Sequence, residues 1–159
     1  MRPLQLKLTG INSYREEQII DFETLTSQGL FGIFGPTGSG KSSILDAMTL
    51  ALYAKLPRDT KNFINTNEKK ANVSFLFSIT TDKTRKYLAE RSFRYHTGNN
   101  ASTVRNTTGR LILYEGDTET VLADKPTEVT NECIRLLGLT SEDFMRTVRV
   151  PRFLTPQQR

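Results

Sequence analysis

Alternating apolar and polar residues predict β structure at the start of the chain. Residues 4–11 (LQLKLTGI) alternate as a half-buried strand does, and residues 18–22 (QIIDF) form a second short apolar stretch after a polar turn. We therefore expect these two segments to pair as a hairpin. Residues 30–35 (LFGIFG) form a continuous apolar run ending in glycine, which is typical of a buried strand.

The apolar spacing changes to that of a helix at Lys41. Apolar residues then recur at three- and four-residue intervals as far as Leu52, and Pro57 limits how far the helix can extend. Residues 57–71 (PRDTKNFINTNEKKA) are polar and rich in turn-forming residues. They predict a surface loop.

The second half of the chain predicts three strands followed by two helices. The strand-like stretches are residues 72–79, 86–96 and 109–116, with the polar link 97–109 as a flexible hairpin tip. Together they predict a β-hairpin region over residues 72–115.

The last part of the chain predicts a helical segment over residues 125–147. Residues 125–139 have helical spacing and Gly138 in position to end the helix. A second short helix is expected from Thr140 or Ser141, either of which can cap it. The sequence shows no internal repeat.

The composition fits one globular domain inside the cell. The chain has 159 residues, of which 36% are hydrophobic and 25% are charged, and this is enough for a single core. It contains no apolar run of about 20 residues and no N-terminal signal peptide, so we expect a cytoplasmic protein without a membrane partner. The one cysteine, Cys133, occupies an apolar helical position and is expected to be a small buried side chain.

Positive charge is concentrated in one part of the chain. The net charge is +5, and the span from Lys83 to Arg110 holds seven Lys and Arg residues against one acid, Glu90. Such an excess suits a polyanion partner such as nucleic acid. A solvated hairpin whose cations protect its edge is the alternative, and the sequence leaves it slightly favoured.

Residues 35–42 (GPTGSGKS) match the phosphate-binding pattern G-x-x-x-x-G-K-[ST] at every fixed position. Glycines allow the main-chain N–H groups to approach an anion, the Lys ammonium reaches the β- and γ-phosphates, and the final hydroxyl is a ligand for Mg²⁺. The pattern also follows a predicted strand and begins a predicted helix, as this mechanism requires. We therefore predict an ATP-Mg²⁺ site, with Ser42 as the metal ligand. The predicted nucleotide-binding residues are Gly35, Pro36, Thr37, Gly38, Ser39, Gly40, Lys41, Ser42 and Ser43.

With these motifs in place, the chain resembles the N-terminal end of the SbcC family, the SMC-like, ABC-type ATPase components of SbcCD double-strand-break repair nucleases. The likeness runs from about Pro3 to Val150. The segments that carry it are LTGINSYREEQIIDF, GLFGIFGPTGSGKSSILDAMTLALYAKLPR, LADK and GLTSEDFMRTV.

The resemblance implies an α/β fold of the P-loop NTPase type, in which residues 1–159 form the N-terminal half of an ABC-type ATPase head. This half combines a phosphate-loop sheet with an antiparallel β subdomain. The implied partners are the C-terminal half of the same head, an SbcD-like nuclease subunit, double-stranded DNA and a second head in a head-to-head homodimer. A coiled coil with a zinc-hook tip joins the two halves in such proteins.

The resemblance also implies roles for three further residues. Asn12 and Ser13 fall where the family contacts the nucleotide from the side of the base and sugar, and Arg58 matches an arginine placed near the phosphates. The alternatives are a simple polar turn at residues 12 and 13, and an ordinary exposed arginine after Pro57.

Several groups needed for ATP hydrolysis are not evident. In place of the Q-loop glutamine that joins the Mg²⁺ shell in the family, the sequence has Arg152. We find no apolar strand ending in Asp-Glu and no LSGG-type signature. The expected function is ATP-Mg²⁺ binding, with hydrolysis dependent on the C-terminal half and on dimerisation.

Two other functions remain open. One is a complete small P-loop kinase or GTPase, although such an enzyme needs an acidic residue that Asp21 and the turn from Glu115 to Asp117 are poorly placed to supply. The other is a non-catalytic module that binds nucleotide, DNA or a protein partner.

Overall fold

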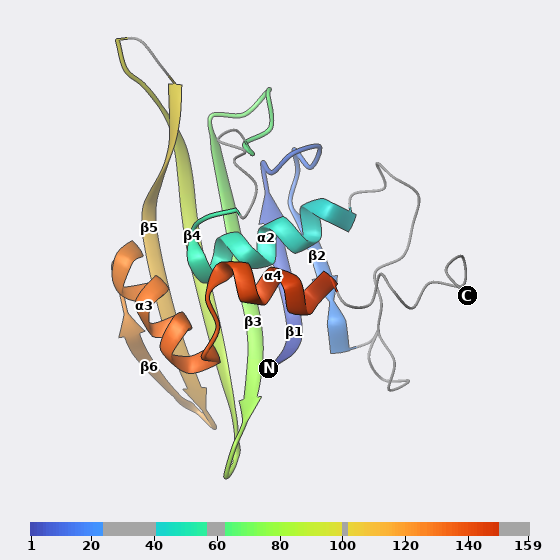
Figure 1. Ribbon diagram of the computed structural model, residues 1–159, viewed down its shortest axis with the longest axis vertical. Coiled ribbons are helices and arrows are strands. Elements are labelled where there is room, and N and C mark those ends of the chain that lie inside the picture. The colour runs from blue at the N-terminus through green and yellow to red at the C-terminus, as the bar shows by residue number, and fades with distance from the viewer. Residues whose placement is uncertain (24–40, 57–62, 100–101, 150–159) are drawn as a thin grey trace, which may run out of the picture.

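In the part of the chain that the structure describes, six strands form one antiparallel sheet, and three helices lie on one side of it (Figure 1). The computed structural model describes residues 1–23, 41–56, 63–99 and 102–149. The strand order is β2-β1-β3-β4-β5-β6. The elements are β1 (Arg2–Thr9), β2 (Gln18–Asp21), α2 (Lys41–Tyr53), β3 (Lys70–Thr80), β4 (Thr84–Thr97), β5 (Ser102–Glu115), β6 (Thr118–Ala123), α3 (Pro126–Leu137) and α4 (Ser141–Arg149).

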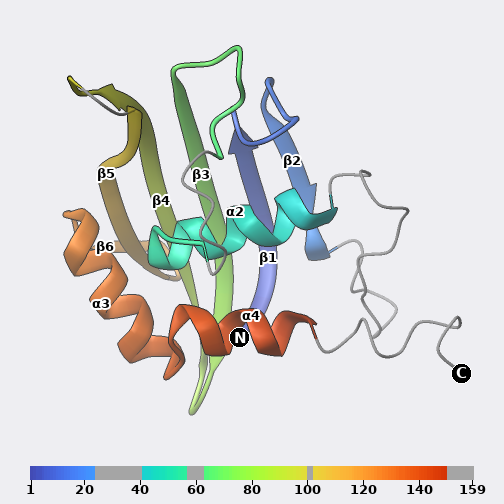
Figure 2. The ribbon, with the colours of Figure 1, turned by 45° about the horizontal axis from the view of Figure 1, so that its top comes forward.

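The core lies between the sheet and helix α2. Alternate residues of β1, β3 and β4 are buried on this side, among them Leu6, Phe75 and Ala89, while the residues between them point to the opposite face. In α2, apolar residues are buried around most of the helix, since α3 and α4 also pack on it (Figure 2). Helix α2 is therefore a central element of the core, rather than a surface helix with one apolar stripe.

The predicted helix ends are confirmed. Gly138 adopts the left-handed conformation (φ 67°) and donates its N–H to the Ile134 carbonyl, which ends α3. Thr140 caps α4, because its hydroxyl accepts a hydrogen bond from the Asp143 N–H (3.3 Å) and donates one to the Asp143 carboxylate (3.0 Å). Cys133 is fully buried, as predicted, and burial raises the pKa of its thiol to about 12.

Three expectations about the loops were wrong. Strand β6 was not predicted, and β5 begins at Ser102, inside the segment expected to be a flexible tip. In the expected surface loop, Phe63 and Ile64 are buried, and the ring of Phe63 meets that of Phe93 edge-on with centroids 5.1 Å apart. Strand β6 and the start of β5 are defined by hairpin pairing with the preceding strand, and the burial of Phe63 depends on its contact with the distant Phe93. A local polar pattern reveals neither kind of contact.

The span from Lys83 to Arg110, which we call the basic span, was expected to expose its cations, Arg91 among them. For Arg91 this expectation is wrong. Its side chain is only 2% exposed and lies on the helix side of β4. All five N–H groups of its guanidinium donate hydrogen bonds. The acceptors, at 2.8 to 3.0 Å, are the main-chain oxygens of Ala51, Leu52 and Pro126 and the side-chain oxygens of Asn106 and Thr130.

These hydrogen bonds fasten the carboxyl end of α2 to α3 and β5. The last carbonyls of a helix lack partners within the helix, and Arg91 supplies donors to two of those in α2. Its positive charge also lies at the negative end of the helix dipole. Burial lowers the pKa of Arg91 to about 10, which still leaves it charged at neutral pH.

We predict that Arg91→Met strongly destabilises the fold. The substitution leaves several buried acceptors without a donor, so the free energy of unfolding should fall by about 3 to 5 kcal/mol. Arg94→Met, at an exposed position of the same strand, is the matched control and should change it by less than about 0.5 kcal/mol. Urea unfolding of the three proteins measures the difference. Equal stability of the two variants would contradict the role given to Arg91.

Candidate nucleotide-binding site

Most of the predicted phosphate loop lies outside the described residues. This applies to Gly35, Pro36, Thr37, Gly38, Ser39 and Gly40, and also to Arg58 and to the strand predicted over residues 30–35. Lys41 and Ser42 are the first two residues of α2, so the predicted helix begins where the motif places it. The first turn of α2 contains no acidic residue, which suits an anion at its amino end.

The turn after β1 lies against the first two turns of α2. The Asn12 side-chain amide donates a hydrogen bond to the Ser43 hydroxyl (3.0 Å) and a longer one to the Asp46 carboxyl (3.4 Å). Ser43 and Asp46 are 6% and 2% exposed. Residues more than thirty positions apart in the sequence thus meet at the amino end of α2.

The main chain of Asn12 is also held in place. Its N–H donates to the Phe63 carbonyl (2.7 Å), and its own carbonyl accepts a hydrogen bond from the Asn65 side-chain amide (2.7 Å). Asn12 has a left-handed conformation (φ 49°), which asparagine tolerates better than most residues. Ser13 follows directly in this turn and is exposed.

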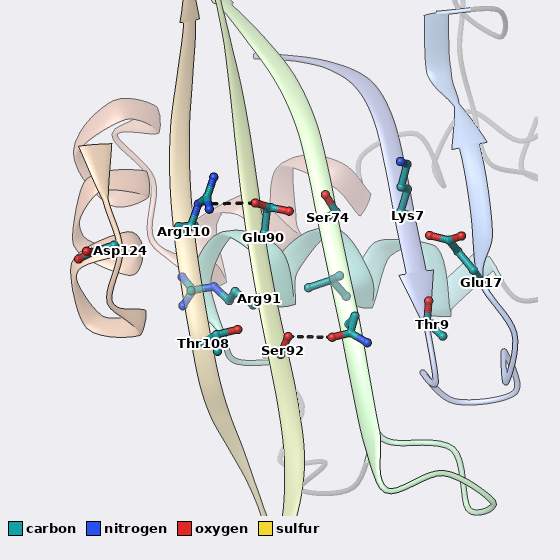
Figure 3. A pocket seen from close by; sticks show the side chains of 13 residues that line it. Lys7, Thr9, Glu17, Ser74, Glu90, Arg91, Ser92, Thr108, Arg110 and Asp124 are labelled. Atoms are coloured by element: carbon teal, nitrogen blue, oxygen red, sulfur yellow. Dashed lines mark hydrogen bonds and ion pairs between the residues drawn. The ribbon is translucent and has the colours of Figure 1, made fainter. Parts of the chain in front are cut away.

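The opposite face of the sheet carries a shallow polar hollow of about 430 Å³ (Figure 3). Side chains of both charges line it, including Lys7, Glu17 and an Arg110–Glu90 ion pair at 3.9 Å. Among the described residues, no three histidine, cysteine or acidic side chains come together in a way that could hold a metal ion. The hollow has no constellation typical of a catalytic centre.

Cations of the basic span are distributed unevenly over the sheet. Lys83 pairs with Glu115 (2.8 Å), and Arg85 pairs with Asp82 (3.0 Å). With Arg91 buried and Arg110 beside Glu90, more than half of the seven predicted cations have protein partners. The span as a whole is therefore not a uniform polyanion-binding surface.

Three other cations form a row across the sheet. Arg94 is the register partner of Lys70 on β3 and of Arg105 on β5, and all three are exposed. Side chains of directly paired residues lie on the same face, here the face of the polar hollow. Within the described part of the chain, no ion pair joins these three residues, which we call the cationic row, to an acid.

The sequence interpretation missed one residue of the cationic row, Lys70, and one residue beside the Asn12 turn, Asp46. Lys70 lies outside the span from Lys83 to Arg110, and only the strand register brings it beside Arg94. Asp46 interrupts the apolar spacing of α2 and is itself buried, and a polar residue at such a position could have been recognised as one with a specific partner.

Comparison with known proteins identifies the family. A model described as an AAA domain matches residues 5–146, and the chain belongs to the AAA domain family. The predicted α/β fold of the P-loop NTPase type is thereby confirmed.

Individual relatives confirm the resemblance to SbcC. The chain is 48% identical over 155 residues to the SbcC component of the nuclease SbcCD from Bacillus subtilis and 44% identical over 152 residues to that from Clostridium acetobutylicum. It is 33% identical over 157 residues to a probable DNA double-strand break repair Rad50 ATPase of Aquifex aeolicus. Each alignment covers 96% of this chain but only 13 to 14% of the relative.

Among solved structures, the SMC head domain from Thermotoga maritima aligns with a TM-score of 0.43 and 19% identity, over 83% of this chain and 42% of that one. In the part of the chain that the structure describes, no helix combines the length and apolar character needed to cross a membrane.

Proposed function

We propose that this chain binds ATP and Mg²⁺ as the N-terminal half of the ATPase head of an SbcCD-type DNA repair complex. The observation that carries this proposal is the complete phosphate-binding pattern leading into α2, whose first turns contact the turn at Asn12. The identity to SbcC proteins from two bacteria supports it.

The residues present suit such a ligand. The amino end of α2 supplies main-chain N–H groups and the positive end of a helix dipole, and its first turn has no carboxylate to repel phosphate. Lys41 would contact the β- and γ-phosphates, and Ser42 would be a ligand of Mg²⁺. When bound, the metal neutralises charge on the phosphates.

The remaining parts of this function depend on other chains or segments. The chain spans about one-seventh of the length of the curated relatives. We assign it four partners, namely the C-terminal half of the head, an SbcD-like nuclease subunit, a second head and double-stranded DNA. We also assign it a cytoplasmic location.

Replacing Lys41 tests nucleotide binding. Charge-assisted hydrogen bonds contribute about 1.5 to 3 kcal/mol, so Lys41→Ala should weaken Mg²⁺-ATP binding at least tenfold. Lys55→Ala is the matched control, since Lys55 is exposed beyond the end of α2 and pairs with Glu142. It should leave affinity unchanged in calorimetric titration. Equal affinities of Lys41→Ala and wild type for Mg²⁺-ATP would contradict the proposal.

We place DNA contact at the cationic row of Lys70, Arg94 and Arg105. Placing like charges opposite one another on neighbouring strands is unfavourable, and a polyanion lying across the strands would relieve this repulsion. The contact would be with phosphates, so little preference for base sequence is expected.

Neutralising the cationic row tests this placement. Changing all three residues to Gln should weaken binding to duplex DNA and reduce the slope of log affinity against log salt by roughly 0.9 for each lost phosphate contact. A control triple variant at Lys83, Arg85 and Arg110 removes the same charge from residues that have acidic partners. It should have a smaller effect in a fluorescence titration. If the two triple variants behave alike, only the net charge matters and the placement is wrong.

The chain by itself should hydrolyse ATP very slowly. Its sequence has neither an Asp-Glu strand end nor an LSGG-type signature, and supplying a missing charge-stabilising group can raise the rate by about 10³ to 10⁵. Adding an SbcC-like C-terminal half in trans should therefore increase phosphate release by orders of magnitude, and more so with Arg152→Gln. Rapid hydrolysis by the purified chain alone, abolished by Lys41→Ala, would instead indicate a complete enzyme.

A further inference from the structure

We infer that Asn106 is a positioning residue for the cationic row, because it holds a β-bulge in β5 that turns Arg105 toward the open face of the sheet. The extra residue of the bulge is Thr107. The inference rests on the proposed DNA contact at the cationic row. It concerns how the fold builds that site, and it assigns a role to a residue that does not itself touch the DNA.

The register between β4 and β5 shifts by one residue at the bulge. Ser92 of β4 pairs with Thr108 of β5, and the two lie side by side in Figure 3. The next residue of β4, Phe93, pairs with Asn106, which leaves Thr107 without a register partner. None of these β5 residues has a positive φ. The bulge is therefore not of the type that depends on a left-handed glycine.

The shift decides which face of the sheet Arg105 occupies. Side chains alternate between the two faces, so a change of register by one residue moves each later side chain to the other face. If the pairing on the Thr108 side of the bulge continued regularly, Arg105 would lie opposite Tyr95, which packs against the core on the helix side. With the bulge, Arg105 instead lies opposite Arg94, and Val104 takes the place opposite Tyr95.

Asn106 holds the bulge through three hydrogen bonds. Its amide nitrogen donates to a main-chain carbonyl on each strand, that of Ser92 (2.8 Å) and that of Thr108 (2.6 Å). Its amide oxygen accepts from the Arg91 guanidinium (2.8 Å), and since arginine has only donors, the oxygen is the atom that must face it. The Thr107 hydroxyl also donates to the Ser92 carbonyl (3.2 Å). The bulge is thus fastened to both strands and to the buried Arg91.

The bulge places Arg105 where its charge is unfavourable unless an anion binds. Like charges directly opposite one another on neighbouring strands repel, and Arg105 joins Lys70 and Arg94 in such a row. In the described part of the chain, no acid forms an ion pair with Arg105, which is exposed. Bulges occur next to functional sites, where they redirect a side chain. We therefore assign this one to the polyanion site.

Asn106→Asp tests the role of the bulge. The carboxylate keeps an acceptor for Arg91, but it replaces the donor to two carbonyls by an oxygen, so the bulge should open while Arg91 stays satisfied. In a fluorescence titration with labelled duplex DNA, the slope of log affinity against log salt should fall by roughly 0.9, as for Arg105→Gln. Asn106→Ala removes the same donor without adding charge and should change the slope equally. Asn131→Asp, at an exposed position of α3, is the matched control and should leave the slope as in wild type.

Two combined variants separate positioning from a general effect on stability or charge. Adding Asn106→Asp to Arg105→Gln should cause no further loss of slope, because Asn106 acts through Arg105. Deleting Thr107 removes the extra residue and makes the ladder regular, with Arg105 still opposite Arg94. The deletion should therefore restore the wild-type slope to the Asn106→Asp protein. A role in stability alone predicts neither result.

The register can also be measured without DNA. Directly paired residues have Cα atoms within the range that a disulfide spans, so a chain with Arg94→Cys and Arg105→Cys should form a cross-strand disulfide on oxidation. Adding Asn106→Asp should slow its formation severalfold. Cys133 is buried and does not compete.

The outcomes distinguish this inference from the proposed function. If the triple Gln variant of the cationic row binds DNA as wild type does, the proposed DNA contact fails and the inference fails with it. If the row binds DNA, but both Asn106 variants keep the wild-type slope or the effect of Asn106→Asp adds fully to that of Arg105→Gln, only the positioning role is overturned. Unchanged disulfide formation in the Asn106→Asp protein overturns it as well. All variants are compared at a temperature at which circular dichroism shows them folded.

Discussion

The arrangement of this molecule depends on a buried guanidinium at the carboxyl end of helix α2. Arg91 donates hydrogen bonds to two carbonyls at this helix end, to one acceptor on β5 and to two acceptors in the first turns of α3. A helix of 13 residues is about 20 Å long, so fixing one end constrains where the other end lies. At that other end, Asn12 ties the helix to the first strands through Ser43 and Asp46. The start of the helix, where the phosphate-binding pattern ends, is thus anchored to the sheet.

The two faces of the sheet have different roles in this account. One packs on α2 and α3, with α4 packed against α2, and contains the core, whereas the other carries a polar hollow and the cationic row. Internal ion pairs engage Lys83, Arg85 and Arg110, so charge counted along the sequence overstates the charge available to a partner. Strand register brings three exposed cations together, Lys70, Arg94 and Arg105, whereas the exposed Lys86 faces Ser78 and Tyr114 in the register. The cationic row therefore has fewer cations than the basic span, and it includes Lys70, which lies outside that span in the sequence.

Local patterns were enough to predict much of the fold. The helical spacing after Lys41, the left-handed Gly138 and the cap at Thr140 each act over a few residues, and the structure confirms them. Strand β6 has no such signal, because its residues are mostly exposed and its pairing with β5 defines it. The burial of Arg91 was also beyond local prediction, since its acceptors come from three distant segments and a charged residue in a strand is usually exposed. In the candidate site, the motif identified the start of α2, whereas the contact between Asn12 and Asp46 required the tertiary structure.

The central claim is that nucleotide binds where the amino end of α2 meets the turn of residues 11–14. Hydrogen–deuterium exchange of the wild-type chain, with and without Mg²⁺-ATP, tests this location directly. The account predicts that ATP slows exchange in peptides covering residues 35–46 and residues 11–14, while β6 and α3 exchange as they do in the free protein. Protection confined to the polar hollow on the opposite face, or no protection at saturating ATP, would contradict it.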